Sequence, residues 1–78
     1  MNKQNQRHVV RDGNQWKVVA PHAKRASAIL PTQERAVDRA RQILRGGGGG
    51  ELLVHSRGGQ IRKRDTVPPA HDPFPPPG

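Results

Sequence analysis

The sequence predicts a small α+β protein in which an antiparallel four-stranded sheet carries one helix packed on one face. Three observations predict this fold. Residues 8–20 and 51–67 each place apolar or β-branched residues on both sides of a glycine-containing turn, which is typical of β-hairpins. Between them, residues 32–45 repeat apolar residues at the spacing of an amphipathic helix. The predicted order of elements is therefore ββαββ.

The first hairpin is indicated by its turn. The Asp-Gly-Asn sequence at residues 12–14 tolerates positive φ angles, and valines flank it on both sides. Residues 22–31 then form a connection, and its Ile29 and Leu30 are expected to reach the core. A proline follows Leu30 and disfavours helical backbone there, so the helix is expected to begin after it.

The helix over residues 32–45 is the clearest element. Thr32 is expected to cap it through its side chain, and Glu34 lies in the first turn, where an acid complements the helix dipole. Gly46 is expected to adopt the left-handed conformation after the last turn. The apolar stripe of this helix consists of Ala36, Val37, Ala40, Ile43 and Leu44.

Five consecutive glycines at residues 46–50 follow the helix. The Gly-Lys-Ser/Thr ending of a phosphate-binding loop is absent, since Glu51 comes next, so we interpret this run as a flexible connection. Residues 51–56 and 61–67 then form the second hairpin, with Gly58 and Gly59 at its turn.

The composition divides the chain into three parts. Residues 1–6 are a polar, disordered N-terminus, residues 7–67 form the domain, and residues 68–78 form a proline-rich tail. Two interpretations of the tail stay open. It either docks onto the core through Phe74 or serves as an extended ligand for an aromatic-lined groove of another protein.

The charge balance indicates the partner. Fourteen Lys and Arg residues against six acids give a net charge of +8, which favours nucleic acid as a partner and, second, anionic membrane surfaces. Solubility alone is the competing explanation. The absence of cysteine and of any long apolar segment predicts a cytoplasmic protein that does not insert into a membrane. A chain of 78 residues has room for only a small core, so we expect no enclosed pocket for a small-molecule substrate.

Strand alternation assigns side chains to the two faces of the predicted sheet. The face under the helix is expected to carry Val9, Trp16, Val18, Leu52, Val54 and Ile61. The open face is expected to carry an apolar middle with a basic border, made of His8, Val10, Lys17, Val19, Leu53, His55, Arg57, Arg62 and Arg64. Lys63 and Asp65 are expected to point toward the helix.

Two functions fit this open face. Its basic border is suited to DNA or RNA phosphates, contacted through Lys17, Arg57, Arg62 and Arg64, with Arg7 as a further contact. No aromatic residue is expected on the face, so recognition of the backbone rather than stacking on bases is predicted. The alternative is a protein interface or homodimer that uses Val10, Val19, Leu53 and His55. We take nucleic-acid binding as the main hypothesis.

No enzyme, cofactor or metal site is expected. The four histidines show no helical i, i+4 pair, and there is no cysteine and no carboxylate cluster beside them. His8 and His55 are instead expected on the open face, where a cross-strand hydrogen bond explains a surface histidine. Ser27 and Ser56 lie in no nucleophile motif, and no carboxylate pair suited to acid–base catalysis is evident.

Several short motifs carry a resemblance to a known family. They are "HVV" at 8–10, Gly13 with Trp16, "RAS" at 25–27, "TQERAVDRARQI" at 32–43, "ELLVHSRGGQIR" at 51–62, Asp65, and "DPFPPPG" at 72–78. With these motifs the chain resembles the DUF2188 family of small bacterial proteins over nearly its whole length. The resemblance implies that residues 7–78 form one unit, and it implies no activity, cofactor or catalytic residue. The glycine run and the residues before Asp72 depart from the family pattern.

Overall fold

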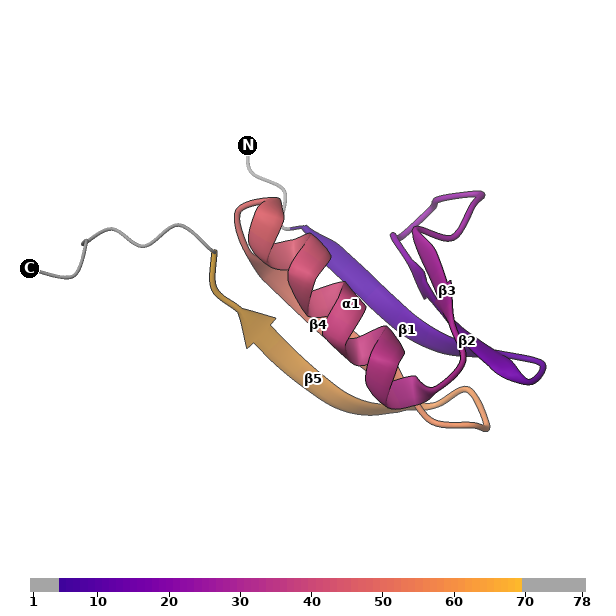
Figure 1. Ribbon diagram of the computed structural model, residues 1–78. Coiled ribbons are helices and arrows are strands. Elements are labelled where there is room, and N and C mark those ends of the chain that lie inside the picture. Colours follow the sequence, from indigo (N-terminus) through magenta and orange to yellow (C-terminus); the bar gives the residue numbers. More distant parts are fainter. Residues whose placement is uncertain (1–4, 70–78) are drawn as a thin grey trace, which may run out of the picture.

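The computed structural model describes residues 5–69, which form a five-stranded sheet with a single helix on one face (Figure 1). The α+β class and the one covering helix are confirmed, whereas the prediction of four antiparallel strands is wrong in detail. The predicted docking of Phe74, like the rest of the tail beyond residue 69, lies outside the described residues. The elements in chain order are β1 (Gln6–Asp12), β2 (Gln15–Val19), β3 (Ala28–Leu30), α1 (Gln33–Gly46), β4 (Gly50–His55) and β5 (Ile61–Val67).

The sheet is mixed because its two central strands run parallel. The strand order is β3-β2-β1-β4-β5, with β4 parallel to β1 and all other neighbours antiparallel. Since β3 occupies the outer edge of β2, the chain crosses over the sheet through α1 and places β4 against the free edge of β1. A crossover of this kind returns the chain in the same direction, which is why the pair is parallel.

The third strand arises from the segment predicted as a connection. Residues 28–30 pair with β2, matching Leu30 to Trp16 and Ala28 to Val18. Leu30 packs against the core as predicted. Ile29 does not, because alternation along even this short strand turns it to the opposite face, where it is 54% exposed.

The core lies between α1 and the face of the sheet that it covers. The predicted helix stripe is confirmed, with Ala36, Ala40 and Leu44 fully buried and Val37 and Ile43 packed at its margins. The strands contribute Val9, Trp16, Val18, Leu52, Val54 and Val67. The prediction of Ile61 as a core residue is wrong, since its side chain is 50% exposed. The core residue that β5 contributes is Val67.

Both ends of α1 are closed by hydrogen bonds. The Thr32 side-chain oxygen accepts from the Arg35 N–H at 3.1 Å, which confirms the predicted N-cap. Gly46, predicted to follow the helix, is its last residue, and the positive φ angles come later, at Gly48 and Gly49.

No helix within residues 5–69 is long and apolar enough to cross a membrane.

One ion pair joins α1 to the edge of the sheet. Arg41 donates to the Asp65 carboxylate at 2.8 Å, and both side chains are about one-third exposed. The predicted orientation of Asp65 toward the helix is therefore confirmed. Because the pair is partly solvated, it contributes at most about 1 kcal/mol to stability, and its main effect is to fix β5 beside the helix.

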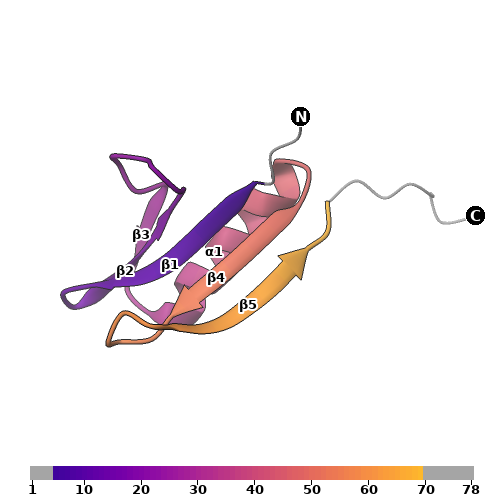
Figure 2. The same cartoon turned by 180° about the vertical axis from the view of Figure 1, so that it is seen from behind.

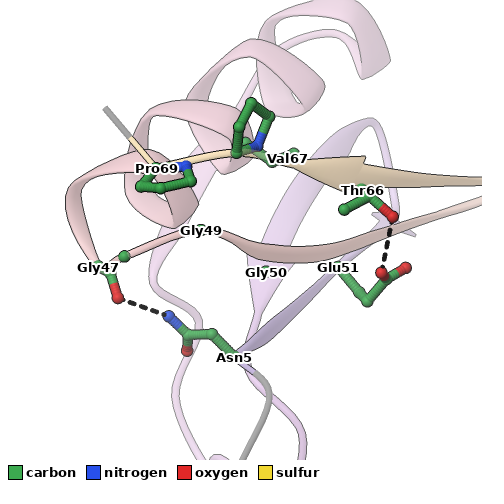
Figure 3. Close-up of a pocket in the computed structure, with 10 residues that line it drawn as sticks. Asn5, Gly47, Gly49, Gly50, Glu51, Thr66, Val67 and Pro69 are labelled. Atoms are coloured by element: carbon green, nitrogen blue, oxygen red, sulfur yellow. Dashed lines mark hydrogen bonds between the residues drawn. The ribbon is translucent and has the colours of Figure 1, made fainter. Parts of the chain in front are cut away.

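The glycine run is a close-packed corner rather than a flexible connection, so that interpretation is wrong. The Gly49 N–H donates to the Leu44 carbonyl at 2.6 Å, and Gly49 has φ 91°. A Cβ atom at Gly49 would lie 2.8 Å from the Val67 carbonyl oxygen. A Cβ atom at Gly50 would overlap the backbone of Asn5, which lies against it and whose side chain reaches Gly47 (Figure 3).

We expect Gly50→Ala to lower the free energy of unfolding by about 1–3 kcal/mol, because the added methyl group displaces the start of β1. Gly46→Ala is the matched control. Nothing lies within 4 Å of a Cβ atom at that helical position, so alanine there is expected to stabilise the protein by about 0.5–1 kcal/mol. Urea unfolding measures both changes, and equal effects of the two substitutions would contradict the close approach at Gly50.

Candidate nucleic-acid interface

The β1–β2 turn and the β4–β5 turn lie at one end of the sheet, beside the first residue of α1 (Figure 1). They meet there because β1 and β4 are parallel, so both strands end at the same edge. We call this region the turn end and define it as residues 11–16, 31–33 and 57–62. Three segments that are distant in sequence bring their side chains together there.

An open hollow of ≈ 500 Å³ lies at the turn end. Three arginines line it from three segments: Arg11 near the end of β1, Arg57 in the β4–β5 turn, and Arg62 at the start of β5. None of the eight lining residues is acidic, the other five being Asn14, Trp16, Pro31, Thr32 and Gln33. The hollow is therefore a concentration of positive charge without internal compensation.

Arg11 is absent from the site residues predicted from the sequence. Strand alternation could have placed it, since Arg11 stands two positions after the core residue Val9. In the structure it pairs directly with Trp16 across the hairpin. Alternation therefore puts it on the helix side of the sheet, just beyond the start of α1. Its Nε donates to the Gly13 carbonyl at 2.8 Å, which fixes the side chain at the turn.

A β-bulge separates two arginines that were predicted to share the open face. Lys63 pairs with Val54, but the next pair joins Ile61 to His55, so Arg62 is left over between them. The prediction that Arg62 lies on the open face is wrong, because this extra residue shifts the alternation. Its Nη1 instead reaches the Gln33 side-chain oxygen at 3.5 Å, at the start of α1. Arg64 keeps its predicted place on the open face, opposite Leu53.

The open face is the side of the sheet turned away from α1, and no described element covers it (Figure 2). Strand register arranges its centre in two rows. The first row crosses all five strands through Ile29, Lys17, Val10, His55 and Ile61. The second row crosses four strands through Val19, His8, Leu53 and Arg64. Neither row contains a carboxylate.

The predicted interface residues differ in exposure. Val10, Val19 and His55 are half-buried, as is Lys17 beside them. Leu53 lies on the open face as predicted, yet it is only 6% exposed, because its row neighbours cover it. The largest exposed apolar side chains of this face are instead at its two edges, Ile29 and Ile61.

Two other predicted phosphate contacts lie away from the open face. Arg7 pairs with Leu52 and therefore lies on the helix side, half-buried and at the end opposite the turn end. Its Nη1 donates to the Gln6 carbonyl at 2.8 Å, so this side chain is held locally. Arg57, predicted on the open face, lies in the β4–β5 turn and lines the hollow. The predicted set of five cations is thus divided among three surfaces.

His8 and His55 form a hydrogen-bonded pair on the open face, which confirms their predicted placement. The Nδ1 of His8 and the Nε2 of His55 are 2.9 Å apart, and the two half-buried rings are tilted by 38°. The other nitrogen of His55, Nδ1, is 3.1 Å from the Gly59 carbonyl oxygen and donates to it. Burial lowers the pKa of His8, and the neighbouring His55 lowers it further.

The described residues contain no cluster suited to hold a metal ion. Within residues 5–69, no three His, Cys, Asp or Glu side chains come together. Another hollow, beside α1, mixes acids with bases, since Glu34 and Asp38 line it together with Arg41 and Lys63. The hollow at the turn end differs from it in carrying one sign of charge.

The geometry defines the protein as a small α+β domain with a mixed sheet, one helix and, at one end, a hollow lined by three arginines and no acid. Residues 7–67 match the model of DUF2188, described as an uncharacterized protein conserved in bacteria. The chain belongs to this family.

A curated relative extends the comparison beyond the family model. The chain is 36% identical over 57 residues to the uncharacterized protein YdaT of Bacillus subtilis strain 168. The match covers 73% of this chain but 37% of YdaT, so the chain spans little more than a third of the relative's length. No solved structure matches the chain.

The lowered pKa of His8 predicts a pH-dependent stability. The unfolded chain takes up a proton at His8 near the ordinary value of 6.5, whereas the folded protein resists it. We therefore expect the free energy of unfolding to fall as the pH drops below about 6.5. Urea unfolding across this range should show a shallower decline in His8→Gln. His22→Asn, at an exposed position with φ 65°, is the control and should keep the wild-type slope.

Proposed function

We propose that this protein is a non-enzymatic module that binds the phosphate backbone of nucleic acid through the arginines of the turn end. The observation that supports this most is the hollow itself, which Arg11, Arg57 and Arg62 line without any acid. Guanidinium groups present paired N–H donors that match phosphate oxygens. Three such groups around one hollow favour a phosphate over a neutral ligand.

The charge of the whole domain supports the same ligand. Thirteen of the fourteen basic residues and five of the six acids lie within residues 5–69, and there the only ion pair joins Arg41 to Asp65. Arg57 and Arg62 therefore have no carboxylate partner in the described part of the chain. A long-range positive potential of this kind accelerates the approach of polyanions.

The binding is proposed to be independent of base sequence. Trp16 is the one aromatic ring at the hollow, and at 8% exposure it cannot stack on a base. The remaining polar side chains are Asn14, Thr32 and Gln33. The Thr32 oxygen already caps α1, and Gln33 already donates to the His55 carbonyl at 3.0 Å. Contacts to phosphates fix the position of a protein on nucleic acid without reading its sequence.

A protein interface on the open face is a second candidate, and one observation favours it. Ile29 and Ile61 are each about half exposed at opposite edges of that face. A homodimer through this face predicts a dimer in light scattering that Ile61→Asp returns to a monomer. A strict monomer at high protein concentration would exclude this candidate.

We expect the double variant Arg57→Ala/Arg62→Ala to bind a fluorescein-labelled oligothymidylate at least about tenfold more weakly than wild type at low salt. The slope of log affinity against log salt should become shallower by about 0.7 for each arginine removed, the value of one contact to a single strand. Fluorescence anisotropy at several salt concentrations near pH 8 measures both quantities.

The matched control is Arg35→Ala/Arg39→Ala, which removes the same charge from exposed positions of α1. It should change affinity much less than the turn-end variant. Equal losses in the two double variants would show that net charge alone attracts the ligand, and absence of binding by wild type at low salt would exclude the proposal. If the protein bound anionic lipid vesicles as tightly as the oligonucleotide, the site would recognise phosphate groups in general and would not be selective for nucleic acid.

A further inference from the structure

We infer that the open face is a second phosphate-binding surface, which becomes active when the His8–His55 pair takes up a proton. The inference rests on the proposed ligand class, nucleic-acid phosphates, but it concerns a different surface from the turn end. It follows from three features of the open face: the arrangement of hydrogens in the pair, the charges around it, and its free surface.

The hydrogen-bond network assigns the protons of the neutral pair. His55 uses its Nδ1–H to donate to the Gly59 carbonyl, so in the neutral ring its Nε2 carries a lone pair. That lone pair must accept from His8, which therefore holds its hydrogen on Nδ1. The nitrogen left without a hydrogen is Nε2 of His8. One proton can therefore bind there without breaking either hydrogen bond.

The pair can take up one added proton without losing a hydrogen bond, and it resists a second. With one proton added, a charged imidazolium donates to a neutral imidazole across the 2.9 Å contact, and such charge-assisted bonds are the stronger kind. A second proton would occupy the last lone pair and place two cations at hydrogen-bond distance. Burial and this repulsion both lower the pKa of His8. Proton uptake at His8 therefore depends on the charge of the neighbouring His55.

The added charge enters a region that already holds cations. On the same face, β2 contributes Lys17 and β5 contributes Arg64, on either side of the two strands that carry the pair. Adjacent strands are about 4.8 Å apart, so the backbone positions of both cations lie within about 10 Å of the pair, roughly one Debye length at 0.1 M ionic strength. From the other side of the sheet, α1 contributes only the uncharged Gln33 side chain, which bonds to the His55 backbone.

The carboxylates of this face lie outside its two central rows. Glu51 is in the row next to His8 and Leu53, at the end away from the turns, where its carboxylate accepts a hydrogen bond from Thr66 at 2.8 Å. Asp12 is at the far end of β1, paired with Gln15. Glu51 also lines a shared hollow with Arg64. Protonation of the pair produces three positive charges across the sheet. A phosphate backbone laid across the strands matches that pattern.

The experiment compares the salt dependence of oligothymidylate binding at about pH 8 and about pH 5.5, on either side of the histidine range. Thymine does not titrate there, so a change reports the protein. We expect the slope of log affinity against log salt to steepen by about 0.7 at the lower pH, the value of one added contact to a single strand. His8→Gln/His55→Gln should abolish that steepening. His22→Asn, the control at an exposed loop position, should retain it.

A second variant keeps the pair intact. Arg64→Gln should weaken binding more at about pH 5.5 than at about pH 8, because it removes a charge beside the protonated pair. An equal salt slope at both pH values in wild type would overturn the inference, and so would steepening that survives in the histidine double variant. A dimer that covers the open face would also overturn it.

The histidine titration separates this inference from the proposed function. NMR of the imidazole resonances should show that His55→Gln shifts the titration of His8, and independent titration of the two rings would overturn the inference whatever the binding result. Conversely, oligothymidylate could bind only at the lower pH, with an affinity that Arg57→Ala/Arg62→Ala leaves unchanged. That result would support phosphate binding by the open face and reject phosphate binding by the turn end.

Discussion

The parallel pairing of β1 with β4 is the constraint on which the remaining structure depends. It joins Arg7 to Leu52 and Val9 to Val54, and thereby places two adjacent inner strands of the sheet under α1. Because both strands run the same way, their turns meet at one end and bring Arg11 and Arg57 to a common hollow. The same pairing sets His8 beside Leu53, within reach of His55 on the open face. Both candidate surfaces therefore arise from one strand pair.

A sheet with a parallel pair at its centre and only one covered face is uncommon. Parallel strands are usually buried on both sides, and their residues are then apolar on both sides. Here the second face combines half-buried valines with a histidine pair and two long basic side chains. Such a face is neither fully hydrated nor apolar enough to require a covering layer. This mixture of half-buried apolar and basic side chains suits a surface that binds a charged ligand in one protonation state and releases it in another.

The sequence was sufficient to predict whatever depends on regular periodicity. The 3.6-residue spacing gave the helix stripe through Ala40 and Leu44, and alternation gave Val9, Trp16 and Val18 as the sheet side of the core. The choice of β1 as the neighbour of β4 could not be predicted in this way. It depends on the three residues of β3, which occupy the outer edge of β2 and leave only the edge of β1 free. Short strands such as β3 have too little periodicity to be recognised.

The candidate site was less predictable, because a single bulge alters it. One unpaired residue at Arg62 exchanges the faces of Ile61 and Arg62 and moves one cation from the open face to the hollow. Nothing in the run of charged residues marks that position. The bulge and the charges also protect β5, which is the long edge strand of the sheet, from pairing with other chains. The basic run thus has a structural explanation alongside its contribution to binding.

The corner at residues 46–50 has a consequence for the way this protein can be altered. Glycine runs are usually chosen as places to lengthen a chain or insert a foreign segment, since they are assumed to be slack. In this protein Gly49 and Gly50 lie against Val67 and Asn5, where both outer ends of the folded unit come together. A tag inserted there would displace Asn5 and Val67, which pack against these glycines from either side. The exposed loop at residues 21–25 is the better place for a label or a fusion, because its residues are exposed and it lies away from this corner.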